Sequence, residues 1–162
     1  MKIPKDDCMI KKLNLHNLNL VKELFELQRA SYLVEAKLIN FFEIPPLKES
    51  MEELMESGET FFGYFEGDEL AGAISYTIDG TELAICRMVV HPNHFRKGIA
   101  QCLLAEVEKN NQQFTVLKVS TGKENSPAKN LYLKNGYKLV RDLEVVPGLV
   151  ISNFEKRRVE ER

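Results

Sequence analysis

The N-terminal part of the chain has a short apolar segment followed by two stretches with helical periodicity. Residues 8–15 can form a short strand. Residues 17–31 place apolar side chains at helical spacing, and Asn17 is a suitable N-cap. The positions on that face are Leu20, Leu24, Leu27 and Ser31. Residues 44–58 begin with a proline pair and then predict a second helix, which Gly58 is well placed to end.

Three apolar segments with strand character come next, at residues 60–66, 69–78 and 82–90. The dipeptides Gly67-Asp68 and Asp79-Gly80 separate them, and the second tolerates the positive φ angles of a tight hairpin. We therefore expect three consecutive antiparallel strands. The third segment is almost entirely apolar, which is typical of a strand covered on both faces.

Helices and strands alternate in the second half of the chain. The pattern predicts a helix at residues 98–110, a strand at 114–120 and a helix at 125–136. The segments 137–146 and 149–156, joined by a Pro-Gly turn, favour a closing hairpin. A strand, a helix and a second strand imply a parallel pair with a right-handed crossover.

These elements predict the α/β fold class. We expect a mixed, mostly antiparallel sheet with one central parallel pair, and helices on both of its faces. The length of 162 residues favours one domain that covers residues 1–162. Residues 157–162 are strongly charged, and we expect a solvated end there.

Composition narrows the classes of function. The chain is 44% hydrophobic with a net charge of -2, so it can build a core and gives no signal for a nucleic-acid partner. No apolar run is long enough to cross a membrane, and the N-terminus has no signal-peptide core. The cysteines and histidines lack metal-binding spacing, so we expect no metal, reduced thiols and a cytoplasmic protein. The cysteines are Cys8, Cys86 and Cys102.

Residues 89–104, "VVHPNHFRKGIAQCLL", join the third strand to a helix through a basic turn. A helix N-terminus offers unpaired N–H groups and a partial positive charge. Gly98 allows close approach of a ligand, and Arg96 and Lys97 add full charges, so the turn suits a pyrophosphate. An ordinary turn with surface charge is the alternative. The P-loop and dinucleotide-binding glycine motifs are absent.

A second motif, "NSPAKNLYLKNGY", follows the next predicted strand, with Asn125 or Ser126 as its helix cap. Together with "MVVHPNHFRKGIAQCLL", it resembles the acyl-CoA-binding core of the GNAT N-acetyltransferase superfamily. The two motifs span about residues 83–140. The order of the surrounding elements also fits, so the resemblance extends over nearly the whole chain and implies the GNAT fold with acetyl-CoA as cosubstrate.

The resemblance also implies roles for single residues. The strand end would hold the pantetheine arm and polarise the thioester carbonyl through backbone groups of Met88, Val89 and Val90. The turn would hold the pyrophosphate, with Arg96, Lys97, Gly98, Ile99, Ala100 and Gln101. Asn125 would lie near the pantetheine arm. Tyr132 would protonate the departing thiolate as a general acid, unless it is only a core aromatic.

The sequence departs from the family pattern in two places. Phe95 stands where the phosphate loop usually begins with Arg or Gln, and Ala100 replaces a glycine, which the family allows. The predicted central strand carries no internal carboxylate to act as a general base. Glu82 at its start and His91 past its end are the candidates, with a water relay as a further route. Alternatively, Glu82 is only a hairpin residue and His91 only a partner for nearby backbone.

Residues 30–50 would shape the acceptor site in this family. Tyr32 and Glu35 would bind a cationic amine, because an acidic group in an aromatic pocket suits such a ligand. The alternative is a segment that packs its own apolar side chains into the core. Those side chains are Phe41, Phe42 and Ile44.

The expected function is therefore acetyl-CoA-dependent N-acetyltransfer to a primary amine, by direct attack in a ternary complex. The acceptor would be a small-molecule or peptide amine, and whether the chain forms a homodimer is left open. Two alternatives remain. One is a non-catalytic acyl-CoA-binding or regulatory module, and the other is an acyltransferase that uses a different acyl-CoA or a protein amine.

Overall fold

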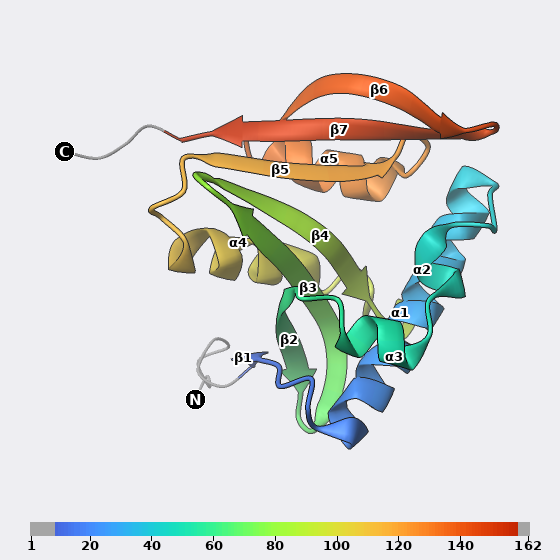
Figure 1. The fold of residues 1–162 in the computed structure, drawn as a ribbon, viewed down its shortest axis with the longest axis vertical. Helices are drawn as coiled ribbons and strands as arrows, with labels where there is room; N and C mark the ends of the chain where they lie inside the picture. The colour runs from blue at the N-terminus through green and yellow to red at the C-terminus, as the bar shows by residue number, and fades with distance from the viewer. Residues whose placement is uncertain (1–8, 159–162) are drawn as a thin grey trace.

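Figure 1 shows the computed structural model, which describes residues 9–158. Cys8 and most of the expected solvated end lie outside the described residues. In chain order, the elements are β1 (Ile10–Lys12), α1 (Leu18–Ile39), α2 (Pro45–Lys48), α3 (Met51–Met55), β2 (Thr60–Glu66), β3 (Glu69–Asp79), β4 (Glu82–Val90), the short 3-10 helix η1 (Pro92–His94), α4 (Ile99–Asn110), β5 (Val116–Gly122), α5 (Ser126–Lys134), β6 (Lys138–Val146) and β7 (Leu149–Arg157).

The strands form one mixed sheet, in the order β1-β2-β3-β4-β5-β7-β6. The pair β4-β5 is parallel, and the other neighbouring pairs are antiparallel. The predicted α/β class, with its central parallel pair and flanking helices, is therefore confirmed.

Two apolar clusters pack on the sheet. The first joins α4 and α5 to the strands and contains Leu103, Val107 and Tyr132. The second lies under α1 and contains Leu24 and Leu54. At about 25 cal/mol per Å² of apolar surface, such burial is the main favourable term in folding.

β3, rather than β4, is the strand most completely covered. Residues Leu70 to Tyr76 on β3 are all buried, whereas β4 alternates and exposes Cys86. The apolar composition of β4 correctly indicated a central strand. It did not indicate that the C-terminal part of this strand borders an opening in the sheet.

The helices of the N-terminal half differ from the prediction. α1 runs to Ile39, well past the predicted end at residue 31, and Asn40 ends it in a left-handed conformation with φ 54°. In residues 44–58 the predicted break contains a short helix of its own, α2, and the predicted second helix is α3, which ends at Met55, before Gly58. Glu49 separates them with an extended backbone, and Ser50 then starts α3 with a capping box to Glu53.

The opening begins at a β-bulge in β4. Tyr76 pairs with Ile85 but Ser75 pairs with Arg87, so Cys86 is an extra residue without a partner on β3. Parallel pairing with β5 ends at the same place, since it covers Glu82–Ile85 and no further. Figure 1 shows β4 turning away from β5 after this point. A gap in the sheet ladder therefore lies between the ends of the two central strands.

Candidate active site

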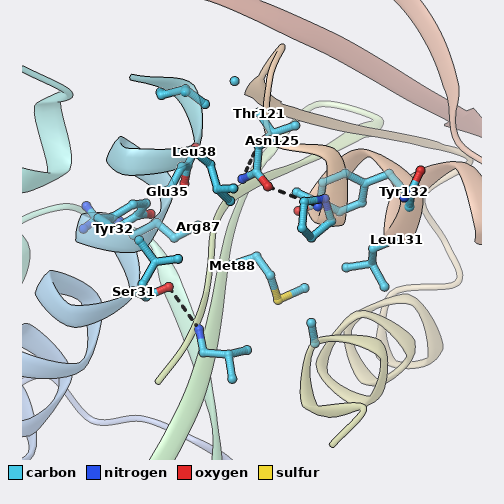
Figure 2. Close-up of a pocket in the computed structure, with 18 of the residues that line it drawn as sticks. Ser31, Tyr32, Glu35, Leu38, Arg87, Met88, Thr121, Asn125, Leu131 and Tyr132 are labelled. Atoms are coloured by element: carbon cyan, nitrogen blue, oxygen red, sulfur yellow. Dashed lines mark hydrogen bonds between the residues drawn. The ribbon is translucent and has the colours of Figure 1, made fainter. Parts of the chain in front are cut away.

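A cavity of about 740 Å³ occupies the opening between β4 and β5. Figure 2 shows Tyr32 and Glu35 of α1 on one side, Leu131 and Tyr132 of α5 on the other, and Met88 of β4 between them. The volume is within the range of small-molecule sites, which is about 300–1,000 Å³. Segments far apart in the sequence therefore meet at one site.

The edge of β4 offers backbone N–H groups to this cavity. Val90 N–H donates to the Ser31 hydroxyl at 3.3 Å, while His91 N–H donates to the Ala71 carbonyl of β3 at 2.9 Å. Because N–H direction alternates along a strand, Met88 N–H points the same way as Val90 N–H, away from β3 and into the opening. Met88 and Val90 line the cavity, whereas the Val89 side chain is buried in the core under α1.

The turn before α4 presents a cluster of N–H groups. Arg96 and Gly98 adopt left-handed conformations with φ 66° and 76°. A Cβ built on Gly98 would meet no atom within 4 Å, so the positive φ is what favours glycine there. The first intrahelical bond runs from Cys102 N–H to the Gly98 carbonyl, which leaves three preceding N–H groups without helical partners. Those three belong to Ile99, Ala100 and Gln101, which line the cavity.

The basic side chains near this turn divide into two groups. Arg96 lines the cavity, but the Lys97 ammonium lies 2.9 Å from His94 Nδ1 and 3.5 Å from Glu66, and Lys97 does not line it. Lys134, which the sequence analysis did not assign, does line the cavity. Gln101 exchanges amide hydrogen bonds with Asn135 at 2.8 and 2.9 Å, which holds the end of α5 beside the start of α4. The structure therefore brings Lys134, rather than Lys97, to the cavity beside this turn.

Asn125, one of the two residues predicted as the cap, is the N-cap of α5. Its side-chain oxygen accepts from Ala128 N–H at 3.3 Å, and its amide donates to the Thr121 hydroxyl at 3.2 Å. Asn125 is buried and lines the cavity. The cap thus fixes the start of α5 against the end of β5.

Tyr132 combines a core ring with a free hydroxyl. The ring packs against Tyr137 and Phe154, with centroids 5.7 and 6.1 Å away. The hydroxyl has no hydrogen-bond partner among the described residues. Arg158 Nε is the one fully buried polar atom without a partner in this set, so the Tyr132 hydroxyl is open to the cavity that the residue lines. Burial, and then the negative charge of Glu35, raise the pKa of Tyr132 above its usual value.

Glu35 is the one carboxylate among the described residues that line this cavity. Burial raises its pKa, while hydrogen bonds from the Asn125 side chain and the Gly122 backbone act in the opposite direction. Tyr32, one turn earlier on α1, is buried, and burial followed by the charge of Glu35 raises its pKa as well. Both predicted acceptor-side residues therefore lie at the site.

The alternative for residues 41–44 was that their apolar side chains pack into the core, and this is true of part of the segment. Phe41 and Ile44 pack into the core under α1, whereas Phe42 is 51% exposed. Ile44 also lines the cavity, together with Pro45 and Pro46. This segment therefore forms an apolar wall on the acceptor side.

Glu82 and His91, the two candidate bases, do not line the cavity. Glu82 forms an ion pair with Lys118 at 2.9 Å, at the end of β4 that is still paired with β5. The Nδ1 atom of His91 accepts from Asn93 N–H at 3.1 Å. His91 is thus a partner for nearby backbone, which was its alternative to a role as base, whereas Glu82 begins β4 after the hairpin turn and also pairs with β5. The site carboxylate comes instead from α1, and no strand motif could reveal it.

Residues 32–158 match the family model for the acetyltransferase (GNAT) domain. The chain belongs to the GNAT acetyltransferase family. This GNAT chain is 36% identical over 155 residues to the UPF0157 protein YqkA of Bacillus subtilis strain 168, which covers 94% of the chain. It spans 45% of the length of that relative.

Solved GNAT structures share the fold. The ribosomal-protein-S18-alanine N-acetyltransferase of Escherichia coli matches with a TM-score of 0.76 and 12% identity, over 94% of this chain and 95% of that one. The PaiA N-acetyltransferase of Thermoplasma acidophilum, solved in complex with coenzyme A, matches with a TM-score of 0.74 and 23% identity, over 91% and 97%.

Three further features of the described part of this GNAT chain concern membranes, metals and thiols. No helix between residues 9 and 158 has both the length and the apolar composition to cross a bilayer. Over the same range, no three His, Cys, Asp or Glu side chains gather in a way that could hold a metal ion. Cys86 and Cys102 are free thiols, and burial raises the pKa of Cys86.

Proposed function

We propose that this GNAT domain transfers the acetyl group of acetyl-CoA to a primary amine by direct attack in a ternary complex. One observation supports this above all others. A single cavity collects the unpaired N–H groups of the first turn of α4, the outward edge of β4, the open hydroxyl of Tyr132 and the carboxylate of Glu35.

The end of the cavity at α4 fits the anionic part of the cosubstrate. Three N–H groups, the helix dipole and the side chains of Arg96 and Lys134 would bind a pyrophosphate. Acetyl-CoA would supply an activated thioester carbonyl to the other end of the cavity. Met88 N–H would donate to the carbonyl oxygen as negative charge develops there.

Two side chains would handle the protons. Glu35 would take the proton that the amine loses, directly or through water, and its raised pKa makes it a stronger base than an exposed carboxylate. The raised pKa of Tyr132 keeps its hydroxyl protonated, so it would give a proton to the departing thiolate. In this step the N–C bond forms and the C–S bond breaks.

The test combines binding with turnover. Calorimetry should show saturable binding of acetyl-CoA, and a panel of primary amines should release CoA thiol only in the presence of the protein. Mass spectrometry of the product should show the amine heavier by one acetyl group. If acetyl-CoA does not bind at millimolar concentration, the proposal is wrong.

The second candidate, a non-catalytic acyl-CoA-binding module, is favoured by one observation. β4 contributes no carboxylate to the cavity, and both Glu82 and His91 are engaged elsewhere. This candidate predicts acetyl-CoA binding without thiol release for every amine tested. Such a result would also remove the proton-transfer role of Glu35.

A further inference from the structure

A second, smaller cavity of about 220 Å³ adjoins the first on the acceptor side. Five residues line both cavities, so the two share a wall. These five are Tyr32, Pro45, Pro46, Cys86 and Arg87. Glu49 and Glu59 line only the smaller cavity, whereas Arg96 and Lys134 line only the larger one. The smaller cavity therefore adjoins the acceptor side of the larger one and lies apart from the basic turn.

Arg87 uses every N–H of its guanidinium within this cluster. Nε donates to Glu59 at 2.9 Å, Nη1 donates to Gln28 and Glu49 at 3.0 and 2.6 Å, and Nη2 donates to Glu49 and Glu59 at 2.8 and 3.1 Å. A guanidinium has five N–H groups, so none remains for an anionic ligand. With two carboxylates and one guanidinium, the cluster has an excess of one negative charge.

Both carboxylates keep capacity to accept a further hydrogen bond. Oε1 of Glu49 accepts from Gln28 and Arg87, and Oε1 of Glu59 accepts from Ser75 and Arg87. Each Oε2 accepts one bond, from Arg87, although a carboxylate oxygen can accept about two. Burial alone would raise the pKa of Glu49, but hydrogen bonds from Arg87 and Gln28 hold it below its usual value, so Glu49 stays ionised.

Tyr32 adds an independent sign that a polar ligand belongs here. The residue is only 7% exposed, and its hydroxyl has no hydrogen-bond partner among the described residues. It is not fully enclosed either, since Arg158 Nε is the one such unpartnered atom between residues 9 and 158. Tyr32 lies beside Arg87 at the boundary of the two cavities (Figure 2). A buried hydroxyl normally has a partner, so this one is free to bind a ligand.

We propose that the acceptor carries a second positive charge, an ammonium group that binds in the smaller cavity. It would donate to Oε2 of Glu49, to Oε2 of Glu59 and to the hydroxyl of Tyr32. The reacting amine would lie in the larger cavity near Glu35, with the connecting carbons against Pro45 and Pro46. This rests on the proposed function, and it makes diamines the favoured substrate class over monoamines.

The test compares diamines with monoamines of equal carbon number. Each member of a series from diaminopropane to diaminohexane is titrated into the protein saturated with CoA, alongside its matched alkylamine. At least one diamine should bind about 10-fold more tightly than its partner, because a hydrogen bond to a charged group contributes about 1.5–3 kcal/mol. Equal affinity across the series, or no binding of any diamine, would overturn the inference.

A variant of Tyr32 tests whether the preference for diamines over monoamines arises in the smaller cavity. Tyr32→Phe keeps the ring and should reduce the affinity for the best diamine about 5-fold or more relative to the affinity for its matched monoamine. Tyr76→Phe, which alters a buried tyrosine that lines neither cavity, should change neither affinity. Equal losses for diamine and monoamine in Tyr32→Phe would contradict the placement of the second charge. If this variant fails to fold, the affinity ratio of the unaltered protein still decides.

Thiol release then separates the two proposals. Selective binding of a diamine without release of CoA thiol would retain the cation site and reject the acetyltransferase. Turnover of amines with equal affinity for diamines and monoamines would retain the acetyltransferase and reject the second charge. Raising the salt concentration should reduce the diamine preference, because the interaction is between charges.

Discussion

The ring of Tyr132 packs in the core, whereas its hydroxyl has no hydrogen-bond partner among the described residues and is open to the cavity. Replacing Tyr132 with Phe retains the ring and removes the proposed proton donor. We expect kcat to fall about 100-fold or more, while acetyl-CoA affinity changes little, because general-acid catalysis typically contributes that much. Steady-state kinetics and calorimetry measure the two quantities.

The matched control for Tyr132→Phe is Tyr76→Phe. Tyr76 is also buried, stacks on Phe62 and lies outside both cavities, so loss of its hydroxyl should leave kcat unchanged. A Tyr132→Phe enzyme as fast as the unaltered one would leave Tyr132 with a packing role alone.

The ionised form of Glu35, which the proposed mechanism needs, should lower the stability of the folded protein. Its pKa is raised in the folded protein, so ionisation opposes folding, and this cost is absent at low pH and develops as pH rises above the unfolded value. Glu35→Gln should therefore gain in Tm relative to the unaltered protein once the pH rises above the unfolded pKa of about 4. Thermal melts at several pH values measure this difference.

The same variant should lose about 100-fold in thiol release at neutral pH, the usual contribution of a general base. A Tm difference that is independent of pH would show that Glu35 ionises as an ordinary exposed carboxylate. Full activity would place the base elsewhere or show that water serves alone.

The structural role of a single residue was predictable where a local motif requires a particular backbone conformation. Asn125, one of the two candidate caps, does cap a helix, and Gly98 does stand at the start of the predicted helix, with a positive φ that the sequence analysis had not specified. That Glu82 does not reach the cavity was not predictable, because this depends on which elements flank the opening. Glu82 lies on the predicted strand yet pairs with Lys118, whereas Glu35 reaches the cavity from a helix.

At the scale of elements, Arg87 joins parts of the fold that the sequence gives no reason to associate. It links β4 to Gln28 on α1, to Glu49 between α2 and α3, and to Glu59 just before β2. Arg87→Met should destabilise the protein by about 3–5 kcal/mol, because two nearly buried carboxylates lose their counter-charge. Urea denaturation gives this free energy.

An exposed arginine is the control for Arg87. Arg157 pairs with Glu155 and its side chain is 72% exposed, so Arg157→Met should change the free energy of unfolding by less than about 0.5 kcal/mol. Arg87→Lys should also destabilise, since one ammonium cannot replace five N–H donors in a planar arrangement. Similar free energies for the Arg87 and Arg157 variants would contradict the central role of the cluster.

Element order and type were predictable, and helix length was not. The hairpin dipeptides and the alternation after residue 98 indicated the sheet correctly. The division of residues 44–58 into α2 and α3 depends on Glu49 adopting an extended backbone while it bonds to Gln28 and Arg87. Such a contact between distant segments leaves no periodic trace in the sequence.

For the whole molecule, the cleft is electrically asymmetric. Arg96 and Lys134 line the part near α4, while Glu35 and the Arg87 cluster lie toward α1 and the acceptor side. An anionic cosubstrate and a cationic acceptor would thus be drawn to different parts of one site. A saturating excess of acetyl-CoA should raise the Tm by about 5–10 °C, from about 2.7 kcal/mol of binding at 100 times Kd.

Thermal melts with and without acetyl-CoA check this shift. Arg96→Ala should reduce it, because the phosphate end loses a charge, and Arg157→Met should leave it unchanged. A full shift in Arg96→Ala would mean that the backbone N–H groups of the turn are sufficient for binding. An absent shift in the unaltered protein would exclude the site as an acetyl-CoA site.

The bulge at Cys86 relates the packing of the β4 side chains to the opening beside that strand. Leu83 and Ile85 face the core under α4, and Val89 faces the core under α1, so the extra residue adjusts the alternation between them. A β4 shortened by Cys86 alone would keep every one of these side chains on its present face. Its N–H groups could then continue the ladder to β5 and close the sheet. A shorter strand would therefore satisfy the packing of the core, and the cavity lies where β4 is one residue longer than that packing requires.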